Sequence, residues 1–193
     1  LFQGLLAEAD VLIEAEPRGW LQQLGLGSLT DQHSRLIHAA MTSWGQQDDR
    51  SDLPYTDLTV LAAGGPVWSC GYDDHSLPPV RGGGHQGYNT GCHLVVMSVL
   101  TALLEREFSG QGQFIDVNMH AAANISTEAA SYSWLVNQST VQRQTGRHAS
   151  TQPSRETQML CADGRYANTG VPPRFPDEFG RLLSWLRNLG LED

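Results

Sequence analysis

The chain has 193 residues, of which 40% are hydrophobic and 17% are charged, so it holds enough apolar material for a folded domain and is not a disordered chain. The net charge is −9, from 21 acidic residues against 12 basic ones, and every basic residue is arginine. The absence of lysine excludes Schiff-base, Walker-A and kinase-type mechanisms that need a lysine in this chain. The scattered arginines form no basic patch, which argues against a nucleic-acid partner.

Three widely spaced cysteines, Cys70, Cys92 and Cys161, form no C-x-x-C pair. They indicate reduced thiols rather than a disulfide framework or a zinc site, so we expect a cytoplasmic protein without a metal centre. The longest apolar run, within residues 94–104, is too short to span a bilayer, and no membrane partner is expected. The chain begins without methionine and in a helical pattern, which predicts a fragment of a longer protein.

The first half of the chain alternates short apolar runs with loops. Residues 1–9 are typical of the end of a helix, residues 11–14 of a short buried strand, and residues 36–42 of a second strand. Residues 58–62 predict a helix or an extended segment that ends at Gly64-Gly65. A loop rich in proline and glycine follows at residues 78–87. Residues 89–106 are apolar nearly all round, so we expect a helix that is buried on several sides, Leu100 included.

In the second half, Gly110 predicts a left-handed C-cap for this helix. Residues 114–117 predict a third strand, and Asn118 a cap for a helix that runs from 119 to about 135. Residues 136–155 are polar and predict irregular structure. Residues 158–161 and 166–169 predict a hairpin because Asp163-Gly164 is a strong turn signal. A last helix begins at Pro176 and stops at Gly190.

Strands that alternate with helices predict an α/β fold with an open, largely parallel, Rossmann-like sheet flanked by helices. We assign residues 1–155 to part of a large domain. Residues 156–193, a hairpin plus a helix, are expected to begin a smaller second domain.

The glycine loop at residues 81–87 leads directly into a helix N-terminus. Free backbone N–H groups and the positive end of the helix dipole make such a place receptive to anions, but a tight loop needed only for packing fits the same residues. Asp73-Asp74-His75 fit an acid/base or metal cluster or, more simply, an exposed turn. The histidines lack metal-ligand spacing, and Asp116 fits either a hydrogen-bonded buried carboxylate or an outward one.

The segment LLEREFSGQGQFIDVNM, residues 103–119, resembles a signature of the family III CoA-transferases. This group includes carnitine and bile-acid CoA-transferases, formyl-CoA transferase and α-methylacyl-CoA racemase. Other segments agree in order: ADVLIE at 9–14, RLIHAAMTSWGQ at 35–46, Asp57-Leu58, and DGRY at 163–166, which is similar to the strand that opens the family's smaller domain.

The resemblance implies an enzyme that moves CoA between carboxylic acids, with acyl-CoA as substrate, no tightly bound cofactor, and an interlocked homodimer when the protein is complete. Residues 11–25 and 36–46 are expected to hold the CoA nucleotide at their strand ends. The family's nucleophilic aspartate precedes a helix glycine by four residues. The matching glycine is Gly91, so the aspartate's position falls on Gly87, which has no side chain. The histidine of racemase members is Thr56 here.

Two other functions stay open. One is acid/base chemistry next to the thioester carbonyl, and the other is a CoA-binding homologue without catalysis that pairs with an active domain. The candidate catalytic residues are His85, Gln86 and Asp73. The candidate substrate-binding residues are Glu14, Arg18, Gly19, Gly83, Gly84, Gly87 and Tyr88.

Overall fold

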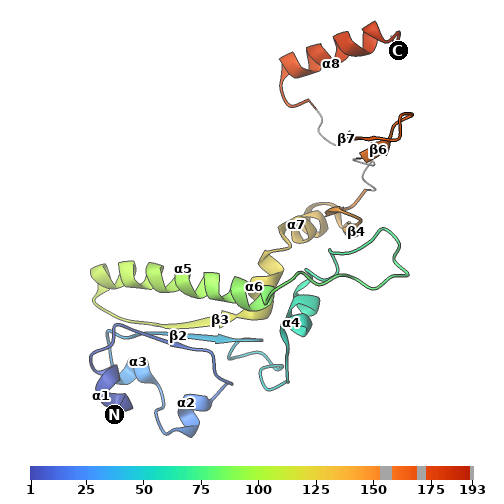
Figure 1. Cartoon of the computed structure of the whole chain (residues 1–193). Helices are drawn as coiled ribbons and strands as arrows, with labels where there is room; N and C mark the ends of the chain where they lie inside the picture. The colour runs from blue at the N-terminus through green and yellow to red at the C-terminus, as the bar shows by residue number, and fades with distance from the viewer. Residues whose placement is uncertain (153–157, 169–172, 192–193) are drawn as a thin grey trace. The chain divides into compact units, whose positions relative to one another are not determined.

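The computed structural model describes residues 1–152, 158–168 and 173–191, and the chain divides into two compact units, Leu1–Gln152 and Pro153–Asp193. The first unit contains a three-stranded parallel sheet in the order β1-β2-β3 (Figure 1). Its strands are β1 (Val11–Glu14), β2 (Ile37–Thr42) and β3 (Phe114–Asn118). The predicted open, parallel α/β sheet is therefore confirmed.

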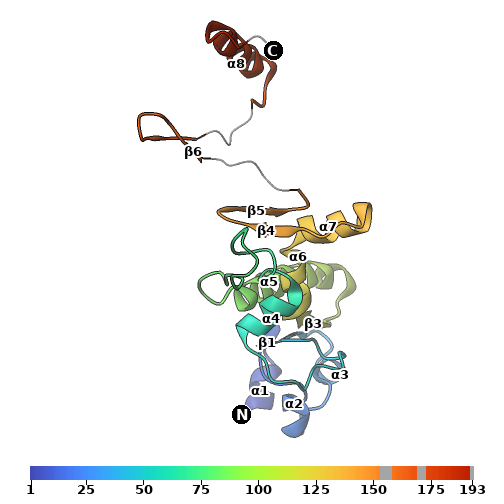
Figure 2. The same cartoon turned by 90° about the vertical axis from the view of Figure 1, so that its right-hand side faces the viewer.

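Helices cover both faces of this sheet (Figures 1 and 2). The long helix α5 (Gln86–Ser109) lies on one face, together with α4 (Asp57–Gly64) and α6 (Met119–Ile125). The short helices α1 (Phe2–Leu6), α2 (Trp20–Gln23) and α3 (Leu29–Gln32) lie on the other. Because side chains alternate along a strand, β2 contributes side chains to the packing on both faces of the sheet, and all of its residues are buried.

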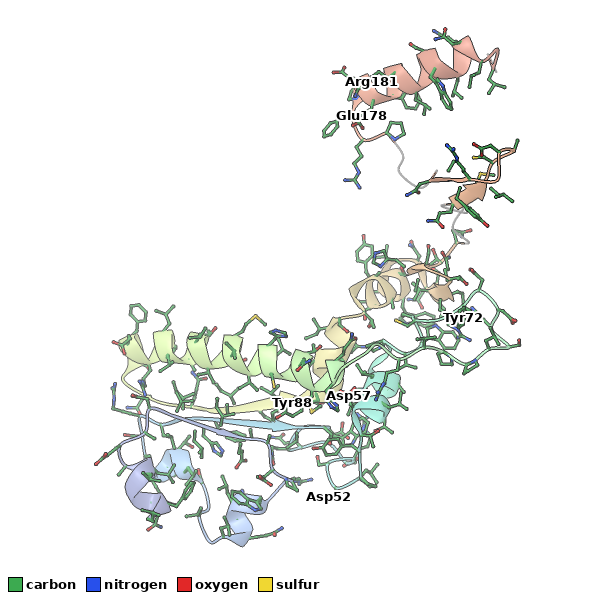
Figure 3. The ribbon with its side chains drawn as sticks, viewed as in Figure 1. Asp52, Asp57, Tyr72, Tyr88, Glu178 and Arg181 are labelled. Atoms are coloured by element: carbon green, nitrogen blue, oxygen red, sulfur yellow. The ribbon has the colours of Figure 1, made fainter. Side chains whose placement is uncertain are left out.

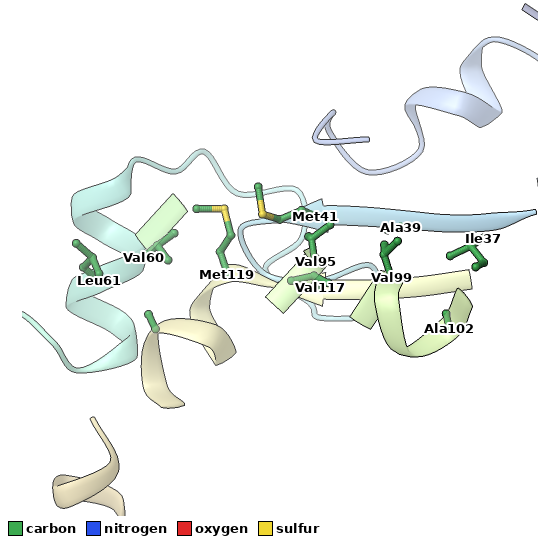
Figure 4. Close-up of a cluster of buried hydrophobic side chains, with 11 residues drawn as sticks. Ile37, Ala39, Met41, Val60, Leu61, Val95, Val99, Ala102, Val117 and Met119 are labelled. Atoms are coloured by element: carbon green, nitrogen blue, oxygen red, sulfur yellow. The ribbon is translucent and has the colours of Figure 1, made fainter. Parts of the chain in front are cut away.

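The larger core lies between the sheet and the α4–α6 layer (Figure 4). Strand residues Ile37, Ala39 and Met41 pack there against Val95 and Val99 of α5. A second cluster on the opposite face is built from one leucine of each short helix and one just before β2: Leu6, Leu21, Leu29 and Leu36.

Helix α5 is buried along one stripe only. Val95, Val99, Ala102 and Arg106 are buried, whereas the exposed fractions of Val96, Met97, Leu100 and Leu104 are 54, 56, 61 and 63%. Within this chain the helix is therefore buried along one stripe only, and Leu100 is exposed. The reason is geometric: a single sheet face covers a single stripe of a helix. That a second layer, partly from another subunit, buries the remaining sides stays a prediction.

By length and composition alone, α5 is apolar enough to cross a membrane, and it is the one such helix found among the described residues. Its contacts are those of a core helix, since Val95 and Val99 pack against the sheet. Its end is as predicted: Gly110 takes the left-handed conformation with φ of 72°, and its N–H donates to Arg106 O. Its start, at Gln86, lies three residues before the predicted Asn89.

The helix predicted at 119 to about 135 is broken in two. Asn118 caps α6 through a bond from Ala121 N, as predicted, but α6 ends at Ile125 and α7 spans Glu128–Asn137. At the break, the hydroxyls of Ser126 and Thr127 donate to the carbonyls of Ala123 and Asn124, at 2.6 and 2.7 Å. Such local bonds compete with the helical ladder, which accounts for the interruption.

The prediction of irregular structure at residues 136–155 is wrong for residues 142–150, which form an antiparallel hairpin of β4 (Gln142–Gln144) and β5 (Arg147–Ser150). Residues 153–155 lie outside the described residues. The second unit holds the predicted hairpin, β6 (Gln158–Leu160) and β7 (Tyr166–Asn168), with Gly164 at φ of 79° in its turn. Helix α8 (Pro176–Asn188) follows, with proline in its first turn as predicted.

Candidate functional site

A pocket of about 440 Å³ opens at the carboxyl ends of β1 and β2, and we call it the strand-end pocket. Open parallel sheets bind ligands at this edge, because the loops that leave neighbouring strands diverge there. The pocket is lined by two segments that follow the strands and by the loop that leads to α4: Glu16, Pro17, Arg18, Thr42, Ser43, Ser51, Asp52, Leu53, Pro54 and Tyr55.

Two lining residues give the strand-end pocket its chemistry. Arg18 is the cationic residue among its described lining residues, and it suits a phosphate or carboxylate group. Thr42 is 8% exposed, and its Oγ1 is buried without a hydrogen-bond partner among the described residues. A buried hydroxyl without a partner is costly, so this atom has a free capacity to bond a ligand group or an ordered water.

The loop after β2 is fixed by two side chains of β3. Asp116 Oδ2 accepts a bond from Gln46 N at 2.8 Å, and Asn118 Nδ2 donates to Trp44 O at 2.7 Å. Between them, Gly45 has φ of 81°, and a Cβ there would lie 3.2 Å from Asn118 Nδ2. The carboxylate of Asp116 is thus hydrogen-bonded and structural, and it holds the edge of the sheet that carries the strand-end pocket.

The glycine loop lies at the N-terminus of α5. Gly83, Gly84, His85 and Gln86 are exposed, and His85 occupies the N-cap position without a side-chain capping bond. Gly84 has φ of 72°, a conformation that favours glycine. The loop therefore presents backbone and an imidazole to its surroundings.

Gly87 is buried, and the space beside it is already filled. A Cβ at this position would lie 3.0 Å from Asp57 Oδ1 and 3.3 Å from Leu61 Cγ. Asp57 Oδ1 accepts a bond from Tyr88 N at 3.1 Å, so Asp57 caps α5 from the neighbouring helix (Figure 3). Its other oxygen, Oδ2, is buried without a partner among the described residues. The carboxylate at this helix terminus therefore comes from α4 and not from the loop.

The remaining candidates are placed as follows. Glu14 Oε1 lies 3.5 Å from His38 Nε2. Glu14 also lines a separate cavity of about 220 Å³ together with Trp20, outside the strand-end pocket. Gly19 is the N-cap of α2, with φ of 78°. Tyr88 is 45% exposed.

Asp73 belongs to a loop that is tied to the β4–β5 hairpin. Its Oδ2 accepts a bond from Thr145 N at 3.1 Å, and Arg143 Nη2 donates to Leu77 O at 3.1 Å. Its neighbour Asp74 has a pKa below the ordinary value, because the Ser76 hydroxyl and N–H donate to it. In the part of the chain that the structure describes, no group of three acidic, histidine or cysteine side chains is placed to hold a metal ion.

The structure brings some candidates together and separates others. Arg18 joins Thr42 and Ser43 in the strand-end pocket, while the glycine loop meets Asp57 at the start of α5. Sequence reasoning expected the strand end of residues 36–46 to hold CoA, from the place of this segment at the carboxyl end of a strand, but it singled out neither Thr42 nor Ser43. It assigned no role at this helix terminus to Asp57.

Comparison with known proteins identifies the family. The family model of CoA-transferase family III matches residues 1–183. Succinyl-CoA:(R)-benzylsuccinate CoA-transferase subunit BbsE of Thauera aromatica is 29% identical over 195 residues, which cover 100% of this chain and 46% of that protein. Formyl-CoA:oxalate CoA-transferase of Streptomyces avermitilis is 32% identical over 130 residues, covering 63% of this chain and 30% of that protein.

A solved structure shares the fold of this chain. A CAIB/BAIF family protein from Brucella suis superposes with a TM-score of 0.73 at 20% identity, covering 99% of this chain and 48% of that one. The chain thus spans less than half the length of these relatives. Since the family model covers all but the last residues, the chain belongs to CoA-transferase family III.

Proposed function

We propose that the protein acts on CoA thioesters as a CoA-transferase, with acyl-CoA and a carboxylic acid as substrates, and that this chain holds CoA in the strand-end pocket. The observation that carries the proposal is the pocket itself. It lies at the edge where open parallel sheets bind ligands, and it contains the Arg18 cation and the unpartnered hydroxyl of Thr42. Glu16 and Asp52 can accept bonds from the amide and hydroxyl groups of CoA.

The absence of a side chain at Gly87 favours one form of this function. The loop at 81–91 supplies no carboxylate, and the volume next to Gly87 is occupied by Asp57 and Leu61. BbsE, whose match covers the whole chain, is named as a subunit of a CoA-transferase. We therefore propose that this chain binds CoA while a carboxylate from another chain forms the covalent adduct.

The exposed face of α5 supports the proposal that the complete protein is a dimer. Val96, Met97, Leu100 and Leu104 form an apolar face that no described residue buries. A homodimer and a cytoplasmic location stay predictions. Sedimentation of the complete protein distinguishes one copy, two copies and a complex with a second chain.

Calorimetry of the complete protein with CoA, acetyl-CoA and succinyl-CoA tests the proposed function. We expect binding of each. A well-folded complete protein that binds none of the three would disprove the proposal.

Thr42→Val is expected to weaken CoA binding and to leave the protein at least as stable as the wild type. Valine has nearly the same shape but lacks the hydroxyl, which has no partner among the described residues and is costly when no ligand is bound. The loss of one hydrogen bond to CoA corresponds to about tenfold in Kd, or about 1.4 kcal/mol. Calorimetry and thermal melts measure the two effects. A structural hydroxyl would show the opposite result, with lower stability and unchanged affinity.

No acyl or CoA adduct is expected on residues 81–91, because the loop has no carboxylate to form one. The measurement is trapping with acyl-CoA and hydroxylamine or borohydride, followed by peptide mass analysis. An adduct in this loop would show that the loop carries a nucleophile after all. The converse variant, Gly87→Asp, is expected to be less stable than the wild type, since it brings a second carboxylate against Asp57.

A further inference from the structure

One wall of the strand-end pocket is a loop without regular secondary structure. Its lining residues follow β2 and precede α4: Ser51, Asp52, Leu53, Pro54 and Tyr55. The backbone of this loop forms turns, in which Ser51 N donates to Asp48 O at 2.9 Å and Leu53 N donates to Arg50 O at 2.8 Å. Turns fix the shape of a loop but not its place on the sheet, so that place depends on side-chain contacts.

Arg50 and Asp48 form a bidentate pair at the start of this loop. Arg50 Nε donates to Asp48 Oδ1 at 2.8 Å, and Arg50 Nη2 donates to Asp48 Oδ2 at 2.7 Å. The backbone N–H of Arg50 also donates to Asp48 Oδ1, at 2.8 Å. These bonds hold the pKa of the Asp48 carboxyl well below its ordinary value. Since a bidentate pair has a defined geometry, it sets the orientation of the guanidinium.

The same guanidinium lies over the ring of Trp44, with Arg50 Cζ 4.5 Å from the ring centroid. Trp44 is 6% exposed, and its carbonyl accepts the bond from Asn118 of β3, so it is fixed to the sheet. A cation is attracted to the face of a tryptophan ring. The residue after Arg50 continues the connection, because Ser51 Oγ donates to Gly45 O at 2.6 Å. Arg50 therefore joins the pocket wall to the end of β2.

We propose that Trp44, Asp48 and Arg50, here called the Arg50 cluster, position the 51–55 wall of the strand-end pocket for CoA without touching the ligand. Arg18 lines this pocket, whereas Arg50 is not among its lining residues, and both prongs of its guanidinium are bonded to Asp48. This inference rests on the proposed function, which assigns CoA to the pocket. The side chains of Arg50 and Asp48 are 40 and 28% exposed, so their pair is expected to contribute little to global stability.

The first arm of the test measures the Kd of the complete protein for CoA. Asp48→Ala removes a negative charge, which by charge alone favours an anion such as CoA, yet we expect it to weaken binding by about threefold to tenfold. Arg50→Ala is expected to weaken binding equally, and Arg50→Lys to recover only part, since lysine lacks the planar fork. Asp49→Ala is the matched control, because it removes the same charge from an exposed neighbour, and it is expected not to weaken binding.

Two results of this arm would overturn the proposal. Unchanged or tighter CoA binding by Asp48→Ala would mean that the pair does not position the wall. Weaker binding by Arg50→Ala alone, with Asp48→Ala unaffected, would make Arg50 a direct ligand of CoA.

The second arm needs no CoA and measures amide hydrogen exchange in the complete protein. Arg50→Ala is expected to speed exchange at Ser51 and Leu53 by about tenfold and to leave Ile37 unchanged, because the Ile37 N–H bonds to Asp10 O within the sheet. Equal acceleration at Ile37 would indicate global destabilisation and would overturn the inference, as would unchanged exchange in the loop.

The two arms separate this inference from the proposed function. Wild-type protein that binds no CoA would disprove the proposed function, while faster exchange in the loop would still support the role of the Arg50 cluster in fixing the pocket wall. Wild-type protein that binds CoA, with equal affinity in Asp48→Ala and Arg50→Ala, would overturn this inference alone.

Discussion

Gly112→Ala is expected to destabilise the protein by about 3 kcal/mol or more, because the added methyl group has no space. Gly112 lies in the turn between α5 and β3, where its N–H donates to Ser34 O at 2.7 Å. A Cβ at this position would overlap the carbonyl of Leu36 and would lie 2.5 Å from the carbonyl carbon of Arg35. Both obstacles are backbone atoms just before β2, so no side-chain rotation can relieve the clash.

Urea unfolding of the complete protein measures this effect. Gly4→Ala is the control, since a Cβ at Gly4 in α1 meets nothing within 4 Å, and alanine favours a helix. We expect Gly4→Ala to be neutral or slightly stabilising. A Gly112→Ala protein that unfolds at the wild-type urea concentration would mean that the α5–β3 turn does not pack against β2 as described.

Arg106→Ala is expected to lower the free energy of unfolding by about 2–4 kcal/mol. The Arg106 side chain is 7% exposed, and it joins the end of α5 to the sheet. Its Nη2 contacts Asp10 Oδ1 at 2.8 Å, and its Nη1 donates to Arg35 O at 2.8 Å and to Asp10 O at 3.3 Å. Removal of the guanidinium leaves these carbonyls without that donor and opens a cavity.

Arg106→Lys separates charge from geometry. A lysine keeps the charge but cannot reach Asp10 and Arg35 with a planar fork, so we expect it to recover only part of the stability. Arg165→Ala is the control, because Arg165 is 88% exposed and lies 3.9 Å from Asp163, and such pairs contribute little. Equal melting temperatures for Arg106→Ala and Arg165→Ala would contradict the assigned role of Arg106.

Local signals in the sequence predicted much of the fold. The strand at 11–14, the C-cap at Gly110, the N-cap at Asn118 and the turn at Asp163-Gly164 are all present. Each of these features depends on residues a few positions apart, whose backbone preferences act wherever the segment lies. The parallel sheet and the family could also be predicted, because both depend on features of contiguous sequence. These features are the apolar runs of the strands and the motif at 103–119.

Contacts between distant segments decided the rest. The β4–β5 hairpin is held in place by Arg143, which donates to the carbonyl of Leu77, 66 residues away in sequence. No pattern of neighbouring residues predicts that contact. The exposure of Leu100 depends on which stripe of α5 faces the sheet.

The same division holds for the candidate site. The sequence by itself determined that position 87 lacks a side chain and that the loop around it is rich in glycine. Only the tertiary structure showed that Asp57, 31 residues from Tyr88, caps α5 and occupies the space beside Gly87. The resemblance implied that residues 11–25 and 36–46 hold CoA together, and the tertiary structure identified Arg18 and Thr42 as side chains of these segments that line one pocket. The physical reason is that local preferences choose helices, strands and turns, whereas burial and hydrogen bonding between distant segments decide which side chains share a site.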